Sequence, residues 1–158
     1  MAKQGLVIRP ATLADLEALT ATRVALFAEL GELPVGFATD SFTALCRTQL
    51  ESMMTSGAAS AWLGGPAGGP PCGTAVLLEY PRIPSPRNLL TREGYILNVY
   101  VAPAYRRRGI AGALIAAAVS EARQRGLGRV RLHTTTAARG VYRSHGFMPR
   151  HDEMELVL

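Results

Sequence analysis

The stretch that decides the fold is NVYVAPAYRRRGIAGAL, residues 98–114. It begins inside an apolar strand, predicted over residues 94–101, and passes through a short basic turn into a helix. Apolar and small residues recur at helical spacing over residues 110–122, and Gly126 is well placed to end this helix. A short strand is predicted over residues 130–134. Because such a strand–helix–strand unit needs a parallel crossover, the stretch predicts an α/β fold.

The turn inside this stretch has the features of an anion site. The first amides of a helix lack intrahelical partners and lie at the positive end of the helix dipole, so they can hold a phosphate. Small residues at Gly109, Ala111 and Gly112 leave the backbone open to such an anion. The three arginines of residues 106–108 add positive charge beside it. An ordinary helix preceded by a solvated basic turn is the alternative that these residues leave open.

The remaining elements predict one domain over residues 1–158, with a mixed central sheet flanked by helices. The predicted order is strand, helix, helix, strand, strand, strand, helix, strand, helix, strand. Besides those named above, these are a strand over 5–9, helices over 12–30 and 40–54, paired strands over 58–63 and 72–80, a helix over 137–145 and a closing strand over 154–158.

Composition narrows the class of protein. The net charge of +5 comes from sixteen arginines and one lysine against twelve acidic residues, which favours a polyanionic partner such as nucleic acid or CoA. Neither a signal-peptide core nor a membrane-length apolar run is found, so we expect no membrane association. Cys46 and Cys72 are isolated thiols, typical of a reducing cytoplasm. Because His133 and His151 have no partner at ligand spacing, we expect no metal.

Two motifs in register resemble a known family. Arg106, Gly109 and Ala111 match the acyl-CoA signature Arg/Gln-x-x-Gly-x-Gly/Ala of the GNAT (GCN5-related N-acetyltransferase) superfamily. ARGVYRSHGF, residues 138–147, resembles the short helix of that family with its tyrosine and closing Gly-Phe. IRPATLADLEAL, residues 8–19, is similar to its first strand and helix. The resemblance spans nearly the whole chain and implies that acetyl-CoA is the cosubstrate.

The resemblance also implies where acetyl-CoA binds. The main chain of residues 99–101 would pair with the pantetheine arm, and a bulge there would free an amide for the thioester carbonyl. Backbone amides of residues 106–112 would hold the pyrophosphate. Many members carry Asn seven residues before the tyrosine, whereas this chain has Thr135, whose hydroxyl could still bond to pantetheine. The implied contacts are Val99, Tyr100, Val101, Arg106, Arg107, Arg108, Gly109, Ile110, Ala111, Gly112, Thr135 and Ala138.

Catalysis needs a proton donor for the leaving thiolate and an acceptor for the amine proton. The resemblance implies Tyr142 as the general acid, because a phenol of pKa near 10 can protonate a thiolate whose conjugate acid is near 8.5 if the surroundings narrow the gap. Packing against Phe147 alone is the other interpretation of Tyr142. Glu93, Glu79 or a water held by Asn98 could serve as the base, and the sequence does not choose among them.

The predicted function is therefore N-acetyl transfer from acetyl-CoA to a primary amine of a small molecule or of a peptide or protein. Substrate choice in similar proteins lies in residues 29–40 and 80–93, which carry charges of both signs here. A non-catalytic acyl-CoA-binding or sensing domain is the first alternative. A nucleic-acid-binding protein is the second, but the arginines are scattered, so we expect no nucleic acid. Dimerisation is common among similar proteins, and an edge strand near the C-terminus could pair in a homodimer.

Overall fold

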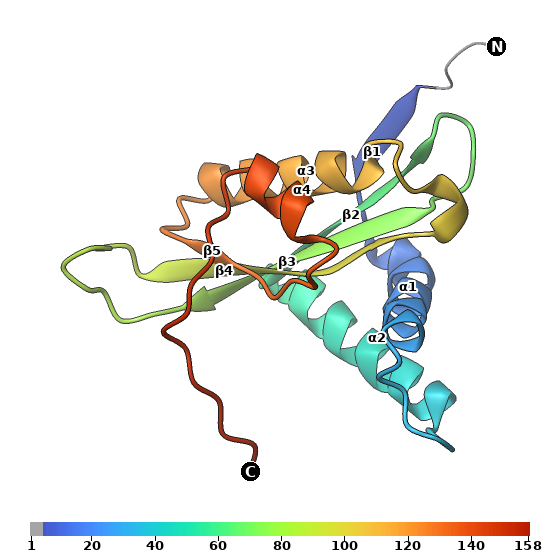
Figure 1. Cartoon of the computed structure of the whole chain (residues 1–158), viewed down its shortest axis with the longest axis horizontal. Coiled ribbons are helices and arrows are strands. Elements are labelled where there is room, and N and C mark those ends of the chain that lie inside the picture. The colour runs from blue at the N-terminus through green and yellow to red at the C-terminus, as the bar shows by residue number, and fades with distance from the viewer. Residues whose placement is uncertain (1–4) are drawn as a thin grey trace.

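The computed structural model describes residues 5–158 and contains one five-stranded sheet in the order β1-β2-β3-β4-β5, with helices packed on it (Figure 1). The first four strands are antiparallel to their neighbours, whereas β5 runs parallel to β4. The elements are β1 (Leu6–Pro10), η1 (Leu13–Asp15), α1 (Leu16–Glu29), α2 (Thr39–Ser56), β2 (Ala59–Pro66), β3 (Gly73–Pro81), β4 (Arg92–Val101), η2 (Pro103–Tyr105), α3 (Ile110–Gln124), β5 (Val130–Arg131) and α4 (Arg139–Ser144). The predicted α/β class, the hairpin of β2 and β3 and the parallel crossover are confirmed.

The sheet carries a core on each face. Successive side chains of a strand point to opposite faces, so β3 sends Ala75 and Leu77 to one side and Val76 to the other. The first pair packs against α3 through residues such as Leu114, which is fully buried. Val76 packs in the second cluster with Leu19 of α1 and with part of α2. Two separate apolar layers therefore fix α3 on one face and the α1–α2 pair on the other (Figure 1).

The central strand β4 is interrupted by a bulge. Its pairing register with β3 shifts between Thr74 and Val76, and opposite this shift Asn98 has a φ of 53°. Asparagine tolerates this left-handed conformation better than most residues. On its other side β4 pairs with β5 only at Gly94 and Tyr95. The main chain of β4 beyond Tyr95 therefore has no β5 partner, and this open edge includes the bulge.

The predicted closing strand over residues 154–158 is wrong. Residues 149–158 have no regular secondary structure, and the side chains of Met154 and Leu158 are fully exposed. A strand forms when its N–H and C=O groups find a neighbouring strand, and this segment leaves the body instead of lying along β5 (Figure 1). Glu153, which pairs with Arg131 at 2.7 Å, lies just before the segment turns away.

Candidate active site

The turn before α3 presents a row of free backbone donors. In the described part of the chain, the N–H groups of residues 107–112 donate to no backbone or side-chain acceptor, and the next one, of Ala113, bonds to the Gly109 carbonyl at 3.0 Å. Gly109 has a φ of 84°, and a Cβ placed on it would meet no atom within 4 Å. The turn and the helix N-terminus therefore carry six consecutive donors without a partner in the described residues. The predicted row also included the N–H of Arg106, but that group donates to the Pro103 carbonyl at 3.3 Å.

Two arginines of this turn are engaged in contacts within the protein. Arg106 donates through Nε to the Val101 carbonyl at 2.9 Å and pairs through Nη2 with Glu29 at 2.6 Å. The hydrogen bond from Arg106 lowers the pKa of the Glu29 carboxyl. Arg108 donates to the Ala104 carbonyl at 3.1 Å, which holds its guanidinium near the turn. Arg106 thus fixes the shape of the turn, and the backbone amides are the groups left free for a ligand.

Two of the small residues in the turn have different reasons to be small. Gly109 has open space around it, so its left-handed backbone is what requires glycine. A Cβ at Gly112 would instead lie 3.3 Å from Cε1 of His145, where α3 approaches α4. His145 is held there by a hydrogen bond between Nδ1 and the Val141 carbonyl at 2.8 Å. The absence of a side chain at Gly112 therefore lets α3 and α4 approach closely, and it also leaves the N-terminus of α3 unobstructed.

The predicted pantetheine-binding residues lie along the open edge of β4 and at the start of α4. Val99, Tyr100 and Val101 follow the bulge, in the part of β4 that β5 does not pair. The hydroxyl of Thr135 accepts a hydrogen bond from the Ala138 N–H at 3.2 Å, which closes the turn before α4. The Thr135 hydroxyl thus has a structural task that the sequence does not reveal.

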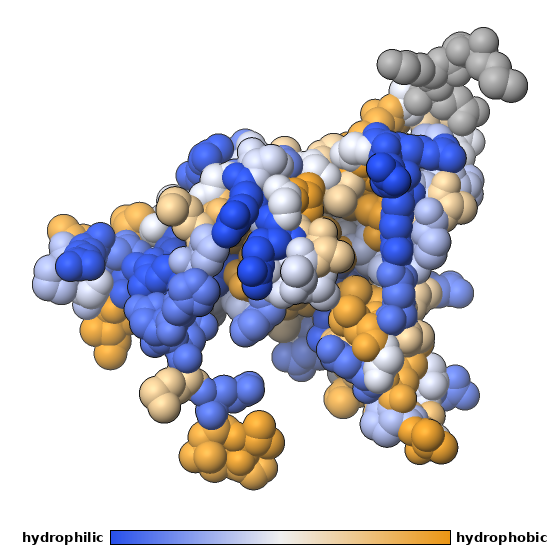
Figure 2. Space-filling view, viewed as in Figure 1, coloured by the Kyte–Doolittle hydropathy of each residue, from blue (hydrophilic) through white to orange (hydrophobic). Residues whose placement is uncertain are grey.

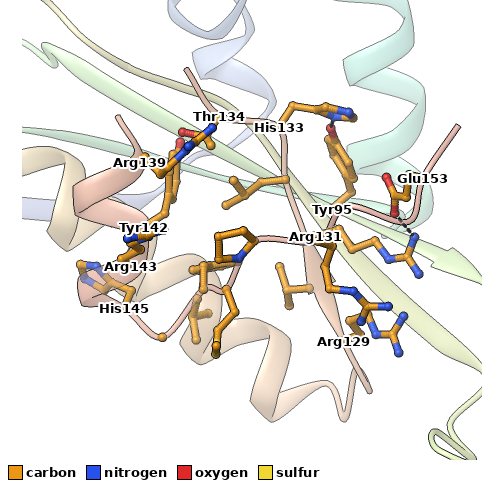
Figure 3. Close-up of a pocket in the computed structure, with 18 of the residues that line it drawn as sticks. Tyr95, Arg129, Arg131, His133, Thr134, Arg139, Tyr142, Arg143, His145 and Glu153 are labelled. Atoms are coloured by element: carbon orange, nitrogen blue, oxygen red, sulfur yellow. Dashed lines mark hydrogen bonds and ion pairs between the residues drawn. The ribbon is translucent and has the colours of Figure 1, made fainter. Parts of the chain in front are cut away.

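Tyr142 lies on the wall of a cavity of about 760 Å³ between β5, α4 and the start of the C-terminal tail. Figure 3 shows its ring reaching from α4 towards Thr134. The side chain is 7% exposed and packs edge-on against Phe147, with ring centroids 5.9 Å apart. This burial raises the pKa of Tyr142. The residue therefore does pack in the core, but it also faces the cavity as a protonated phenol.

A second hydroxyl in the same cavity was not predicted. The Tyr95 hydroxyl contacts Nδ1 of His133, and both side chains line the cavity (Figure 3). Burial raises the pKa of Tyr95. The signal lies in the sheet register, because Tyr95 pairs with Arg131 and His133 follows two residues later on the same face. Only the parallel pairing of β4 and β5 makes the two residues neighbours.

Glu93 is 2% exposed and lies within an ion cluster at the beginning of β4. Its carboxylate lies 2.9 Å from Arg82, 3.5 Å from Arg131 and 3.9 Å from Arg129. Tyr80 donates its hydroxyl proton to Oε2 at 3.0 Å. A buried charge requires such partners, so this arrangement explains Glu93 structurally. Its role as general base stays a prediction.

Asn98, which the sequence predicts as a holder of a water that could act as the base, is 3% exposed and turns its side chain towards α1. Its Nδ2 donates to the Leu19 carbonyl at 3.2 Å. The structure thus puts Tyr142 and Asn98 in different cavities, on either side of the sheet region that holds the bulge.

Within residues 5–158, no helix combines the length and the apolar character needed to cross a membrane. In the same residues, no three His, Cys, Asp or Glu side chains gather closely enough to hold a metal ion.

Comparisons with known proteins agree with this geometry. The model of the acetyltransferase (GNAT) family matches residues 27–147. A GCN5-related N-acetyltransferase from Ralstonia eutropha is 30% identical, with a TM-score of 0.85 over 97% of this chain and 99% of that chain. A predicted acetyltransferase from Clostridium acetobutylicum, solved with acetyl-CoA, is 23% identical, with a TM-score of 0.86 over 97% of this chain and 96% of that chain.

More distant structures share the fold. Glucosamine-6-phosphate N-acetyltransferase from Arabidopsis thaliana is 14% identical, with a TM-score of 0.70 over 97% of this chain and 98% of that chain. The comparison with curated proteins gave no match. The family match covers most of the chain, including both the free amides of the turn and Tyr142, and the chain therefore belongs to the GNAT acetyltransferase family.

Proposed function

We propose that residues 1–158 form one N-acetyltransferase domain that moves the acetyl group of acetyl-CoA to a primary amine of a small molecule or peptide. The observation that carries the proposal is the row of six free amides over residues 107–112, beside the open edge of β4. CoA offers a pyrophosphate for the amides and a pantetheine amide chain for the strand edge. The relative from Clostridium acetobutylicum, which carries acetyl-CoA, supports this choice of donor.

In this proposal the amine attacks the thioester directly. The amine nitrogen forms a bond to the carbonyl carbon, the carbon–sulfur bond breaks, and the sulfur leaves as a thiolate. An amide N–H on β4 after the bulge would stabilise the oxyanion that forms on the carbonyl oxygen. The amine loses a proton to a base, for which Glu93, Glu79 and a water at Asn98 stay the candidates.

Tyr142 would return a proton to the thiolate. Burial raises the pKa of Tyr142. The surroundings of the phenol therefore do not bring its pKa closer to that of a thiol. Desolvation also destabilises a thiolate formed in the same cavity, which raises its affinity for a proton. The phenol therefore stays protonated until the thiolate appears beside it, as a general acid requires.

The experiment that tests the proposal is titration calorimetry with acetyl-CoA, followed by chromatographic measurement of CoA released in the presence of a panel of amines. We expect heat on adding acetyl-CoA and amine-dependent CoA release. Absence of heat contradicts the proposal, because the amide row would then not serve CoA. Heat without release for any amine would instead favour an acyl-CoA-binding domain.

The proposal also includes a cytoplasmic location. The free thiols of Cys46 and Cys72 agree with such a reducing compartment.

The homodimer is the remaining part of the proposal, and the exposed tail supports it. Met154, Leu156, Val157 and Leu158 are each more than four-fifths exposed, and Figure 2 shows a hydrophobic group at the end of the tail, apart from the body. Such a surface is normally covered by a partner. We expect light scattering to give a dimer for the full chain and a monomer after deletion of residues 154–158. Ile83→Lys, which removes an apolar side chain 88% exposed elsewhere, should leave the dimer intact. A monomeric full chain contradicts this prediction.

A further inference from the structure

Tyr95 and His133 form a pair in the cavity that contains Tyr142. Tyr95 comes from β4 and His133 from the segment just after β5, and their ring centroids lie 5.8 Å apart. The Tyr95 hydroxyl contacts Nδ1 of His133, and both side chains line the cavity. Figure 3 shows Tyr142 entering from α4 on one side and the pair on the other. Groups able to transfer a proton therefore face the cavity from two sides.

The position of the pair along β4 connects it with the proposed reaction. If the turn after Val101 holds the pyrophosphate, the pantetheine chain runs back along the open edge of β4. This edge ends at Tyr95, because Gly94 and Tyr95 are the residues of β4 that pair with β5. The acyl end of acetyl-CoA would therefore lie towards Tyr95. The inference drawn below rests on the proposed acetyl transfer.

Acyl transfer needs its proton donor and its proton acceptor in different places. The attacking nitrogen and the leaving sulfur are two substituents of the same tetrahedral carbon, so the groups that serve them approach that carbon from different directions. Tyr142 would serve the sulfur from α4. The Tyr95 hydroxyl lies on the β4 side of the same cavity, where it can serve the nitrogen.

The two members of the pair complement each other chemically. Burial raises the pKa of Tyr95, so at neutral pH its phenol keeps a proton that it can donate to Nδ1 of His133. The hydrogen of neutral His133 then lies on Nε2. A protonated phenol can accept a second proton only if it passes on its own, and Nδ1 is the acceptor for it. The His133 side chain is exposed, so it can exchange this proton with water after each turnover.

The carboxylates that the sequence suggests as bases are engaged elsewhere. Glu93 lies 2.9 Å from Arg82, and Glu79 pairs with Arg92 and, at 3.3 Å, with Arg125. Neither carboxylate belongs to the lining of the cavity that contains Tyr142. Both members of the Tyr95–His133 pair do, which makes the pair the better placed acceptor.

A cation on the same strand does not prevent His133 from taking up a proton. Arg131 lies two residues before His133 and on the same face of β5. Its guanidinium pairs with Glu153 at 2.7 Å and with Glu93 at 3.5 Å. The two carboxylates offset the charge of Arg131, so an imidazolium at His133 would not face an unpaired cation from its own strand.

We propose that Tyr95 and His133 act together as the general base for the attacking amine. As the nitrogen bonds to the thioester carbon, one of its protons passes to the Tyr95 oxygen while the original Tyr95 proton passes to Nδ1 of His133. The nitrogen becomes neutral and His133 becomes an imidazolium. Tyr142 protonates the departing thiolate. After product release His133 gives its proton to water and Tyr142 takes one up, so the proton count closes.

The first test is a pair of single variants and their combination. His133→Ala and Tyr95→Phe should each lower kcat by at least about 100-fold, the lower range for loss of a general base. The double variant should be about as slow as either single variant, because the two residues act as one unit. The rate is measured as CoA release with whichever of glycinamide, spermidine and Nα-acetyl-lysine reacts fastest. Losses that multiply in the double variant would overturn the relay.

The second test separates catalysis from structure. Added imidazole should raise the rate of His133→Ala by at least about tenfold, because a free base can replace the missing one, and it should not rescue Tyr95→Phe. His151→Ala is the matched control: His151 also lines the cavity but lies in the tail, so its loss should leave kcat unchanged. Absence of rescue by imidazole would assign His133 a structural role and overturn the proposal.

The outcomes for the pair and for acetyl transfer are distinguishable. Wild-type CoA release that survives in both His133→Ala and Tyr95→Phe overturns the role of the pair and leaves acetyl transfer intact. If none of the three amines is accepted, nitrogen NMR of the protein without acetyl-CoA decides. We expect the hydrogen of neutral His133 on Nε2, with a resonance that shifts in Tyr95→Phe. A hydrogen on Nδ1, or no shift in Tyr95→Phe, overturns the inference.

Discussion

Replacing Tyr142 by Phe should lower kcat by at least about 100-fold while the affinity for acetyl-CoA stays unchanged, because the change removes only the proton that the thiolate needs. The ring of Tyr142 packs edge-on against Phe147, and phenylalanine keeps that contact. The measurements are steady-state CoA release and calorimetry with acetyl-CoA. Because burial raises the pKa of Tyr142, the midpoint for loss of the acid form in the wild-type enzyme should lie above that of an ordinary tyrosine, about pH 10.

Tyr105→Phe is the matched control for this variant. Tyr105 lies in η2 outside the cavity that contains Tyr142, so loss of its hydroxyl should leave kcat near the wild-type value. Equal kcat for Tyr142→Phe and wild type would show that Tyr142 only packs in the core, and would remove it from the mechanism. A basic limb of kcat well below pH 10 would also argue against its role as the acid.

Replacing Gly109 by Val should weaken acetyl-CoA binding by at least about tenfold. Gly109 has a φ of 84°, a conformation in which a β-branched side chain is strained by about 1–3 kcal/mol. To relieve that strain the turn must rotate, which takes the free amides of residues 107–112 out of their common orientation. Calorimetry with acetyl-CoA measures the loss of affinity, and thermal unfolding measures the loss of stability.

Gly126→Val separates the two effects. Gly126 also has a positive φ, of 68°, and open space around it, but it ends α3 at the far end from the amide row. We expect this variant to lose stability of similar size, about 1–3 kcal/mol, and to bind acetyl-CoA as the wild type does once folded. If both variants keep full affinity, the backbone of the turn does not hold the pyrophosphate.

The sequence predicts most of the fold because its signals are local. Helical spacing over α3, the glycine that ends it and the apolar run of β3 depend on residues near one another in the chain. The amide row is predictable for the same reason, since the free donors of a helix N-terminus follow from its backbone alone. The predicted helix start at residue 12 is local in the same way, because the N–H of Thr12 bonds to Oδ2 of Asp15 at 2.8 Å, only three residues along the chain.

The features that the sequence does not predict depend on contacts between segments far apart in the chain. The contact of Tyr95 with His133 follows from the register of two parallel strands, which neither strand reveals alone. The ion pair of Arg106 with Glu29 joins α1 to a turn far along the chain. The closing strand fails on the same ground, because the apolar character of residues 154–158 predicts a strand but says nothing of which chain supplies its neighbour.

The guanidinium of Arg106 joins the end of β4 to the last residue of α1 through its contacts with the Val101 carbonyl and with Glu29. The same helix carries Arg23, which lines a cavity of about 240 Å³ between the sheet and α2, so one helix connects the turn before α3 with this cavity. Thermodynamic linkage requires any coupling between two ligands to be equal in both directions. An acceptor that prefers the acetyl-CoA-loaded protein must therefore tighten acetyl-CoA by the same factor, and severing the Arg106–Glu29 contact should bring that factor closer to one.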